Sequence, residues 1–325
     1  MPITSVTSDP EELTLTFVAE FSVPVHRLWD AYADPRQVER FWGPPDWPAT
    51  FLRHDHFVGG RSHYFMTGPD GEQSHGLWNV LAVDEGRSFL VEDGFAGEDG
   101  LPNPAMPSMR LQFTFDALES GSRLVSTTYF NSVEERDQLL QMGAEEGARA
   151  AMAQIDAVLA DQTAAAADHG TEAQLLTDTQ VRLSRVLRGA PQQVWDAHND
   201  PELLRRWLFG PDGWRLAQCH LAHEPGDDYR FAWAPEPGVE GQPFAFTGEL
   251  KESEPPRRAV TTEQMEGMPG SPTLNEQTFT PVHGGTLLCV VITYETQELR
   301  DQILATGMTD GMEASYARLE ADVLA

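Results

Sequence analysis

Histidine, arginine and tyrosine side chains in predicted strands are the residues of this chain that could do chemistry. His54 and His56 are separated by one residue, so in a strand they lie on one face, as a metal-binding or proton-transfer pair would need. Arg53 and Tyr129 could offer a charge and a hydroxyl group to the carbonyl of a bound molecule, as a cyclase or dehydratase requires. Solvent-facing histidines, a surface arginine and a core tyrosine are the commoner explanation. We therefore name these four residues as catalytic candidates only, and predict neither a metal site nor a cofactor.

Motifs that identify the common enzyme classes are missing from the sequence. It contains no GxSxG nucleophile motif, no phosphate-binding P-loop, and no GxGxxG that opens a helix after a strand. The two cysteines, Cys219 and Cys289, are flanked by apolar residues, which is typical of small buried side chains. The residues therefore leave open whether the protein is an enzyme.

Aromatic and methionine side chains form a larger set with a different meaning. Polarizable side chains around a concave sheet are what apolar ligand pockets are usually made of. Met106, Pro107 and Met109 lie where a loop could cover the mouth of such a pocket. The candidate ligand-binding residues are Trp42, Tyr64, Trp78, Phe113 and Met142 in the first half of the chain, and Trp207, Trp233, Phe246, Met308 and Met312 in the second half.

A repeat that spans the chain places these residues in two similar domains. The recurring segments are Trp29-Asp30-Ala31 with Asp34-Pro35, matched by Trp195-Asp196-Ala197 with Asp200-Pro201, and Arg136-Asp137-Gln138 with Gly143 and Gly147, matched by Arg300-Asp301-Gln302 with Gly307 and Gly311. The two copies are about 165 residues apart at both ends, far more than the roughly 20–50 residues of a solenoid repeat. We predict a domain over 1–160, a linker over 161–179 and a second domain over 180–325.

Both halves predict the same order of elements. The first half predicts a strand, two short helices, six strands and a long helix over 13–21, 25–33, 35–42, 47–57, 61–66, 75–83, 88–93, 110–118, 123–130 and 132–159. The second half predicts a strand over 181–187, helices over 191–198 and 201–208, strands between 214 and 294, and a helix over 297–324. An antiparallel sheet with one apolar face needs a cover, and only the last helix is long enough. The prediction is an α+β fold, a curved antiparallel sheet around a long C-terminal helix, with the ligand site between them.

Charge and hydropathy narrow the classes of partner. The formal net charge is −29 at pH 7, and an acidic surface repels nucleic acid and anionic lipid. No basic segment followed by an apolar run opens the chain, and no apolar stretch approaches the roughly 18 residues of a membrane span. We expect a cytoplasmic protein that binds neither nucleic acid nor membrane.

Short signatures in both halves resemble one protein family. They are the Trp-Asp-Ala helices with their Asp-Pro, Gly59-Gly60-Arg61, Tyr64-Phe65-Met66, Pro69-Asp70-Gly71, His75-Gly76, Pro255-Pro256-Arg257, Gly284-Gly285-Thr286-Leu287 and the Arg-Asp-Gln helices with their two glycines. The chain resembles the SRPBCC (START-like, Bet v 1-like, helix-grip) superfamily, and within it the branch named for the C-terminal domain of the heat-shock-protein ATPase activator. The resemblance implies two tandem helix-grip domains. It implies less about function, because superfamily members bind lipids or aromatic metabolites, cyclise polyketides or sequester toxic products.

The chain departs from the pattern of that family at two matching positions. Family members usually carry Trp after the second helix glycine, where this chain has Ala148 and Met312. Such a Trp would press into the sheet, so its loss is expected to widen each cavity. The first copy also has Asp84-Glu85-Gly86-Arg87 where the family pattern is Pro-Pro-Arg.

The sequence leads us to expect that at least one cavity binds a hydrophobic or aromatic small molecule. Sequestration of a compound, or resistance to it, is the role that such binding would serve. The alternatives are a cyclase, aromatase or dehydratase that acts on a polyketide-like or aromatic metabolite, and a cofactor of a chaperone ATPase. We expect the first copy, which carries the histidines, to be the active one. Duplication also suggests that the copies pack as an intramolecular pseudo-dimer about a local twofold axis.

Overall fold

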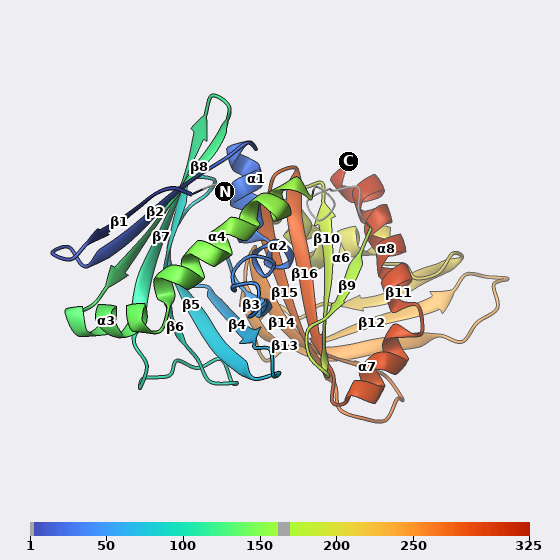
Figure 1. Ribbon diagram of the computed structural model, residues 1–325. Coiled ribbons are helices and arrows are strands. Elements are labelled where there is room, and N and C mark those ends of the chain that lie inside the picture. The colour runs from blue at the N-terminus through green and yellow to red at the C-terminus, as the bar shows by residue number, and fades with distance from the viewer. Residues whose placement is uncertain (1–2, 162–169) are drawn as a thin grey trace. The chain divides into compact units, whose positions relative to one another are not determined.

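Figure 1 shows a computed structural model of the chain, which describes residues 3–161 and 170–325. The chain divides into two compact units, Met1–Ala165 and Ala166–Ala325, which we call the first and second unit. Each unit has one eight-stranded antiparallel sheet and a set of helices. The predicted α+β fold, two tandem helix-grip domains, is confirmed. Within the described ranges, none of the helices combines the length and the hydropathy that crossing a lipid bilayer requires.

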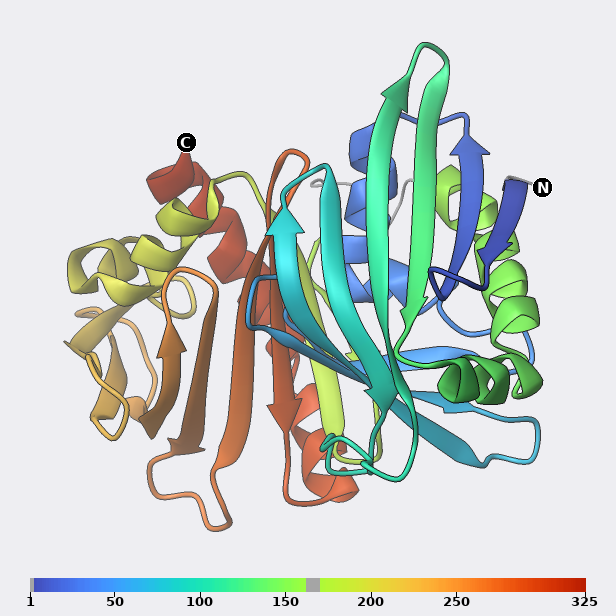
Figure 2. The same cartoon turned by 90° about the vertical axis from the view of Figure 1, so that its left-hand side faces the viewer.

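The sheet of the first unit has the strand order β1-β2-β8-β7-β6-β5-β4-β3. Side chains alternate between its two faces, so that Leu15, Phe17 and Phe21 of β2 are buried while Glu20 is exposed. Figures 1 and 2 show α4 lying along one face of this sheet. The strands are β1 (Ile3–Asp9), β2 (Thr14–Phe21), β3 (Ala49–His54), β4 (Arg61–Thr67), β5 (Gln73–Asp84), β6 (Ser88–Phe95), β7 (Ser108–Leu118) and β8 (Gly121–Phe130).

Strand β1 was missing from the sequence prediction. It pairs with β2 at the edge of the sheet, but most of its side chains are exposed, so its sequence carries little of the alternation that marks a half-buried strand. The first unit therefore has eight strands, one more than the sequence predicts.

Two short helices close one end of the sheet, as predicted. Helix α1 (Val25–Ala33) leads directly into α2 (Pro35–Val38), and the Asp34 carboxylate between them accepts hydrogen bonds from the Arg36 backbone N–H at 2.9 Å and from its guanidinium at 2.8 Å. These bonds fix the side chains of α1, whose Trp29 packs against Phe115 with ring centroids 5.3 Å apart. Helix α2 is shorter than the predicted 35–42, and residues 39–41 continue as turns.

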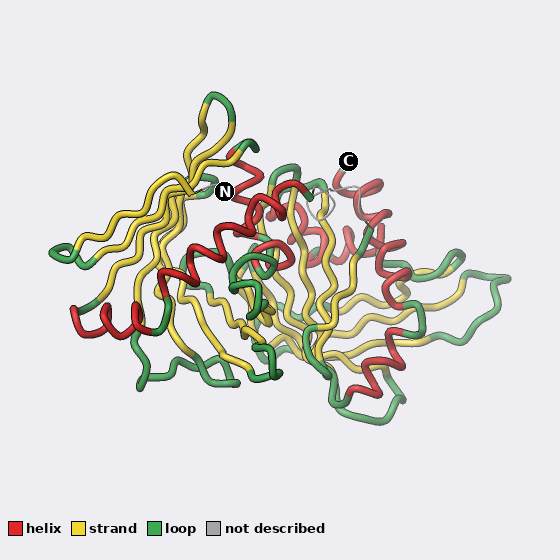
Figure 3. The backbone as a smooth tube through the Cα atoms, viewed as in Figure 1, coloured by secondary structure: helices red, strands yellow, loops and turns green. Residues whose placement is uncertain are grey.

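The long closing helix of the sequence prediction is two helices in the structure. Helix α3 (Val133–Gln141) and helix α4 (Ala144–Ala160) meet at Gly143, whose φ of 89° lies in the left-handed region that a helix interior does not allow. The two appear as separate coils at an angle in Figure 3. Helix α4 covers the sheet with Met152, Ile155 and Leu159, all buried in the core of the first unit.

The second unit repeats this order of elements. Its sheet has the order β11-β12-β13-β14-β15-β16-β10-β9, and its last long helix is again divided at a glycine, Gly307, with φ of 83°. The strands are β9 (Glu172–Leu175), β10 (Gln180–Leu187), β11 (Trp214–His220), β12 (Asp228–Pro235), β13 (Phe244–Glu254), β14 (Arg258–Met265), β15 (Thr273–Val282) and β16 (Gly285–Thr293). The helices are α5 (Pro191–Asn199), α6 (Pro201–Trp207), α7 (Gln297–Leu304), α8 (Met308–Leu319) and a final π-helical turn, η2 (Glu320–Leu324).

Strand β9 lies inside the segment for which the sequence predicts a linker, 161–179. Residues 162–169 of that segment are outside the described residues. Residues 172–175 pair antiparallel with β10, which gives the second sheet its eighth strand. Strand β10 in turn carries the buried Arg185, whose guanidinium pairs with Glu313 at 3.0 Å and Glu320 at 3.1 Å and so ties the sheet to the closing helix.

Candidate functional site

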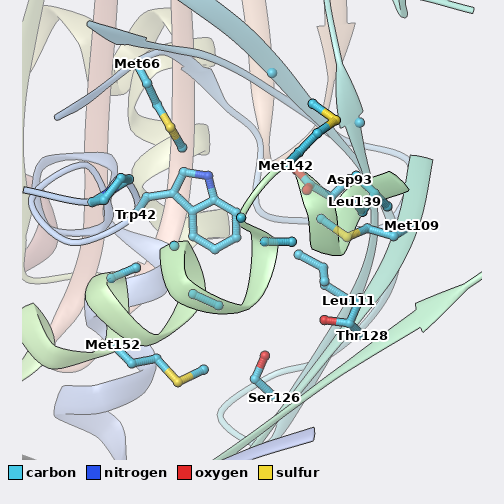
Figure 4. Close-up of a pocket in the computed structure, with 18 of the residues that line it drawn as sticks. Trp42, Met66, Asp93, Met109, Leu111, Ser126, Thr128, Leu139, Met142 and Met152 are labelled. Carbon is cyan, nitrogen blue, oxygen red and sulfur yellow. The ribbon is translucent and has the colours of Figure 1, made fainter. Parts of the chain in front are cut away.

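The first unit contains a cavity of about 350 Å³ between its sheet and the helices α3 and α4. Its floor is formed by side chains on β2, β4, β5, β6, β7 and β8, and the turn after α2 adds Trp42 and Pro44. Figure 4 shows the Trp42 ring projecting into this space, with Met66 on one side and Met152 on the other. The cavity therefore lies where the sequence analysis expects a ligand site, between the curved sheet and its closing helix.

Small residues on α4 leave this space open. Ala144, Gly147, Ala148 and Ala151 line the cavity on successive turns of the helix, together with Gly143 at its start. A Cβ atom added at Gly147 would have no atom within 4 Å. Ala148 stands where the family pattern has Trp, and its position on the lining agrees with the expectation that the smaller residue widens the cavity.

The walls are mainly aromatic and methionine side chains. Trp42 makes an edge contact with Trp78, with ring centroids 4.5 Å apart, and a second with Tyr64 at 6.1 Å. Phe113 stacks against Phe89 at 4.6 Å beneath the floor. These contacts fix the rings in place, so the apolar surface offered to a ligand is preformed.

One buried acid interrupts the apolar wall. Asp93 of β6 is 7% exposed and lines the cavity, and its carboxylate accepts a hydrogen bond from the Tyr64 hydroxyl at 3.0 Å. Tyr64 reaches it by crossing Gly76 on β5, where any Cβ atom would lie 2.4 Å from the tyrosine ring. Gly76 is therefore required for the Tyr64–Asp93 contact.

Burial shifts the proton affinity of this pair. Loss of solvent raises the pKa of Asp93 to about 7, although the hydrogen bond from the Tyr64 hydroxyl favours the carboxylate and acts in the opposite direction. Burial also raises the pKa of Tyr64 well above its usual value, and the neighbouring Asp93 adds to the effect. Asp93 therefore holds its proton to a higher pH than an ordinary aspartic acid does.

Three further polar atoms near the cavity have no hydrogen-bond partner among the described residues. They are the indole nitrogens of Trp42 and Trp78 and the Nε2 of His75, all buried. His75 lines the cavity, and its Nδ1 lies 3.1 Å from the Nε2 of His63. Burial first, and then the nearby His75, lowers the pKa of His63. Buried polar atoms of this kind are usually satisfied by water or a ligand.

The structure distributes the candidate ligand-binding residues unevenly. Trp42, Tyr64, Phe113 and Met142 line the cavity of the first unit, and Trp78 lies behind Trp42 with no exposed surface. In the second unit, Trp207 stacks on Tyr316 at 6.1 Å, and the Trp233 indole donates to the Leu208 carbonyl at 2.9 Å. The three remaining candidates, which are partly buried against the core of the second unit, are Phe246, Met308 and Met312.

None of the four catalytic candidates lines this cavity. Both ring nitrogens of His54 are engaged, with the Ser62 hydroxyl at 2.8 Å and the Tyr32 carbonyl at 2.9 Å, which makes His54 a structural residue. His56 is buried beside Trp29, and burial followed by the charge of His54 lowers its pKa to about 3.

The other two catalytic candidates have local partners of their own. Arg53 pairs with the Asp55 carboxylate at 2.5 Å, and the Tyr129 ring lies beneath the guanidinium of Arg110 at 5.8 Å. Ion pairing and cation–π contact account for both side chains without a bound molecule.

Sequence reasoning missed Asp93, although a signal for it was present. Phe89, Val91 and Asp93 are two residues apart on a predicted strand, so all three share its buried face. An acid in that position is costly unless something pairs with it, and it therefore marks a functional candidate.

Comparisons with known proteins show which family and which solved structures this chain is similar to. The family model described as Activator of Hsp90 ATPase homolog 1-like protein matches residues 22–160 and again 188–323. A solved structure from Mycobacterium smegmatis is 50% identical, covers 49% of this chain and 97% of its own, and has a TM-score of 0.46. One from Arthrobacter aurescens is 41% identical, with 51% and 96% covered and a TM-score of 0.47. An AHSA1 protein from Silicibacter pomeroyi is 20% identical, with 45% and 97% covered and a TM-score of 0.38. No match was found among curated proteins.

Proposed function

We propose that this chain, which belongs to the Activator of Hsp90 ATPase homolog 1-like family as two tandem copies, binds an apolar or aromatic small molecule in the cavity of its first unit. The observation that carries the proposal is that cavity of about 350 Å³, within the range of roughly 300–1,000 Å³ that small-molecule sites occupy. Its volume equals that of about a dozen water molecules at roughly 30 Å³ each. An apolar ligand that displaces them removes its own surface and that of the walls from water.

The walls support binding because they are rigid as well as apolar. Trp42, Tyr64 and Phe113 are each held by other rings, so little side-chain freedom is lost when a ligand enters. The small side chains of α4 supply the volume, and Met66 and Met152 can adapt to its shape.

A filled cavity is the direct test. Ala148→Trp places a large side chain in the space, and Ala153→Trp, at an exposed position of the same helix, is the matched control. We expect the neutral fluorescent probe N-phenyl-1-naphthylamine to bind the wild type and Ala153→Trp equally. Its affinity for Ala148→Trp should fall about tenfold or more, because the new indole ring fills the space that the aromatic rings of the probe would otherwise occupy.

A second filling variant guards against misfolding of the first. Gly147→Leu points into space that no atom occupies within 4 Å of the Cβ position, and it should lower probe affinity in the same way. Equal binding by the wild type and both filled variants, or no binding by any of them, would contradict the proposal. The natural ligand is then sought by native mass spectrometry of the protein purified from its own host.

A second candidate function, an enzyme of the cyclase or dehydratase kind, has one observation in its favour. Asp93, with a pKa of about 7 and a place on the cavity wall, has the proton affinity that a general acid or base needs near neutral pH. If the protein is an enzyme, the wild type should convert one or more metabolites in an extract of its host, and Asp93→Asn should leave the same metabolites unchanged. Mass spectrometry of the two incubations measures the difference. Identical metabolite profiles for both proteins would leave binding alone as the function.

A further inference from the structure

We propose that the ligand of this cavity carries a basic nitrogen, and that its ammonium group pairs with Asp93 at the cavity wall. The inference rests on the proposed function and deepens it, because it names the chemical class of the ligand: a lipophilic amine with an aromatic or aliphatic body.

The cavity lining has an uneven set of charged side chains. Among the described residues that line the cavity, Asp93 is the one acid, and there is no lysine or arginine. A ligand with a carboxylate, phosphate or sulfate group would therefore bring a second negative charge into a low-dielectric space whose one basic side chain is His75. The lining thus disfavours an anionic ligand.

Asp93 has no cationic partner in the protein. Two other buried acids of the first unit have one: Asp34 pairs with Arg36 at 2.8 Å, and Asp55 pairs with Arg53. Within the described part of the chain, the Asp93 carboxylate has only a tyrosine hydroxyl at hydrogen-bond distance. A buried carboxylate without a counter-ion is strongly disfavoured, and an incoming cation would relieve that cost.

The Asp93 carboxylate has hydrogen-bonding positions that the protein leaves free. A carboxylate has about four lone-pair positions, and the Tyr64 hydroxyl occupies one of them. Asp93 itself is on the cavity lining (Figure 4), and the Tyr64 bond leaves positions on its carboxylate for a ligand. An ammonium group has up to three N–H donors to fill them.

Aromatic rings beside Asp93 favour a cation for an independent reason. The rings of Trp42 and Tyr64 both line the cavity, with centroids 6.1 Å apart. The negative face of such a ring attracts ammonium groups, and the attraction is stronger where water is excluded. A cavity whose lining holds both a carboxylate and aromatic rings is thus suited to an amine, whereas a neutral alcohol would gain only one hydrogen bond.

Three probes with one apolar body test the inference by calorimetry on the full chain at pH 8. They are 1-naphthylmethylamine, 1-naphthalenemethanol and 1-naphthoic acid. We expect the amine to bind at least about tenfold more tightly than the alcohol, and the acid to bind more weakly than either, because a hydrogen bond between charged groups is the strongest of the three contacts.

Variants assign the preference to Asp93. Asp93→Asn should bring the amine to within about threefold of the alcohol, because asparagine keeps an oxygen that either probe can reach but carries no charge for the ammonium group. Glu92→Gln removes one negative charge from the neighbouring position on β6, outside the cavity lining, and should keep the preference for the amine, which excludes a general effect of the net charge of −29.

Wild-type protein provides a readout that does not depend on the folding of a variant. Amine binding should weaken about tenfold per pH unit below pH 7, because the protonated carboxyl must first lose its proton, while alcohol binding should not change with pH.

The outcomes separate the two proposals. Equal amine and alcohol affinities, a pH-independent amine affinity, or an amine preference that survives Asp93→Asn would overturn the amine inference and leave ligand binding intact. If neither the amine nor the alcohol binds, and N-phenyl-1-naphthylamine does not bind either, the proposed function itself fails.

Discussion

Asp93→Asn should make the first unit more stable at alkaline pH. The folded-state pKa of Asp93, about 7, lies above its ordinary value of 3.8, so the folded unit holds the proton more tightly than the unfolded chain. The stability that this group contributes is therefore present below pH 3.8 and is lost as the pH rises to 7. Asparagine is neutral at every pH and keeps an oxygen for the Tyr64 hydroxyl, so the variant avoids that loss.

The size of the effect follows from the difference between the two pKa values. About three units at 1.36 kcal/mol each give about 4 kcal/mol. The free energy of unfolding of Asp93→Asn, minus that of the wild type, should be smallest near pH 4, rise by about 1.4 kcal/mol per pH unit, and level off above pH 7.

His56 gives the same unit a pH dependence of the opposite sign. Its folded-state pKa of about 3 lies below the ordinary 6.5, so the stability it contributes is present above pH 6.5 and is lost as the pH falls. Between pH 4 and 6.5 these two contributions have opposite signs, so that Asp93 offsets the effect of His56 in the wild-type first unit. Asp93→Asn removes one of them, so the variant should lose about 3 kcal/mol on acidification from pH 6.5 to 4.

Methionine oxidation in urea measures this unit separately. Met152 is buried in the core of the first unit and becomes oxidisable when that unit unfolds. The urea midpoint at each pH, multiplied by the slope of the transition, gives the free energy. A difference between variant and wild type that stays constant from pH 4 to 8 would refute the reasoning, because Asp93 would then have an ordinary pKa.

Three further substitutions test the local arguments. Gly76→Ala should cost about 2–3 kcal/mol in the same oxidation assay, because its Cβ would lie 2.4 Å from the Tyr64 ring, and an unchanged midpoint would show that Tyr64 can move aside freely. Gly147→Ala should instead add about 0.5–1 kcal/mol, since alanine favours a helix and its methyl group meets no atom within 4 Å; a loss of stability would mean that the site is crowded. Ser132→Ala removes the hydroxyl that accepts from the Glu135 N–H at 3.1 Å, so hydrogen exchange in the first turn of α3 should speed up in line with a loss of about 1 kcal/mol.

The fold could be predicted from the sequence because its strongest signals are local and occur twice. The alternation of β2 and the Asp-Pro caps of α2 and α6 are visible in short windows, and the repeat confirms each one. Strands β1 and β9 escaped prediction because they are short edge strands, with few buried side chains to show a pattern. The break before α4 escaped prediction because a glycine within a helical pattern does not by itself reveal a positive φ.

The candidate site was predicted in part, and the division has a physical cause. Apolar wall residues such as Trp42 and Phe113 follow from hydrophobic patterning, and they line the cavity. The role of His54 could not be predicted, because its partners Ser62 and Tyr32 come from other elements and only the folded chain brings them together. The position of Asp93 on a buried strand face can be read from the sequence, but its partner cannot, because Tyr64 comes from another strand.

The second unit shows which part of the site is common to both copies. Counted from the equivalent hairpins, where Asp84 pairs with Ser88 and Glu254 with Arg258, Asp93 and Glu263 occupy the same position, five residues into the following strand. Glu263 also lies near a tyrosine hydroxyl that crosses a glycine, since Tyr229 is opposite Gly248 and its oxygen is 3.3 Å from the Glu263 carboxylate. Desolvation raises the pKa of Glu263 as well.

What differs between the copies is the helix that faces this acid. When the paired glycines of the two closing helices are aligned, Ala144, Ala148 and Met152 of α4 correspond to Met308, Met312 and Tyr316 of α8. Each of these replacements adds volume on the side that faces the sheet, and the Tyr294 hydroxyl already lies 4.0 Å from the Met308 sulfur. An acid close to a tyrosine hydroxyl is thus common to both sheets, while the small side chains of Ala144 and Ala148 are replaced by methionines in the second unit. For that reason the proposal places the ligand in the first unit, where the small side chains of α4 leave volume open. The proposed chemical class of the ligand, an amine, depends on Asp93.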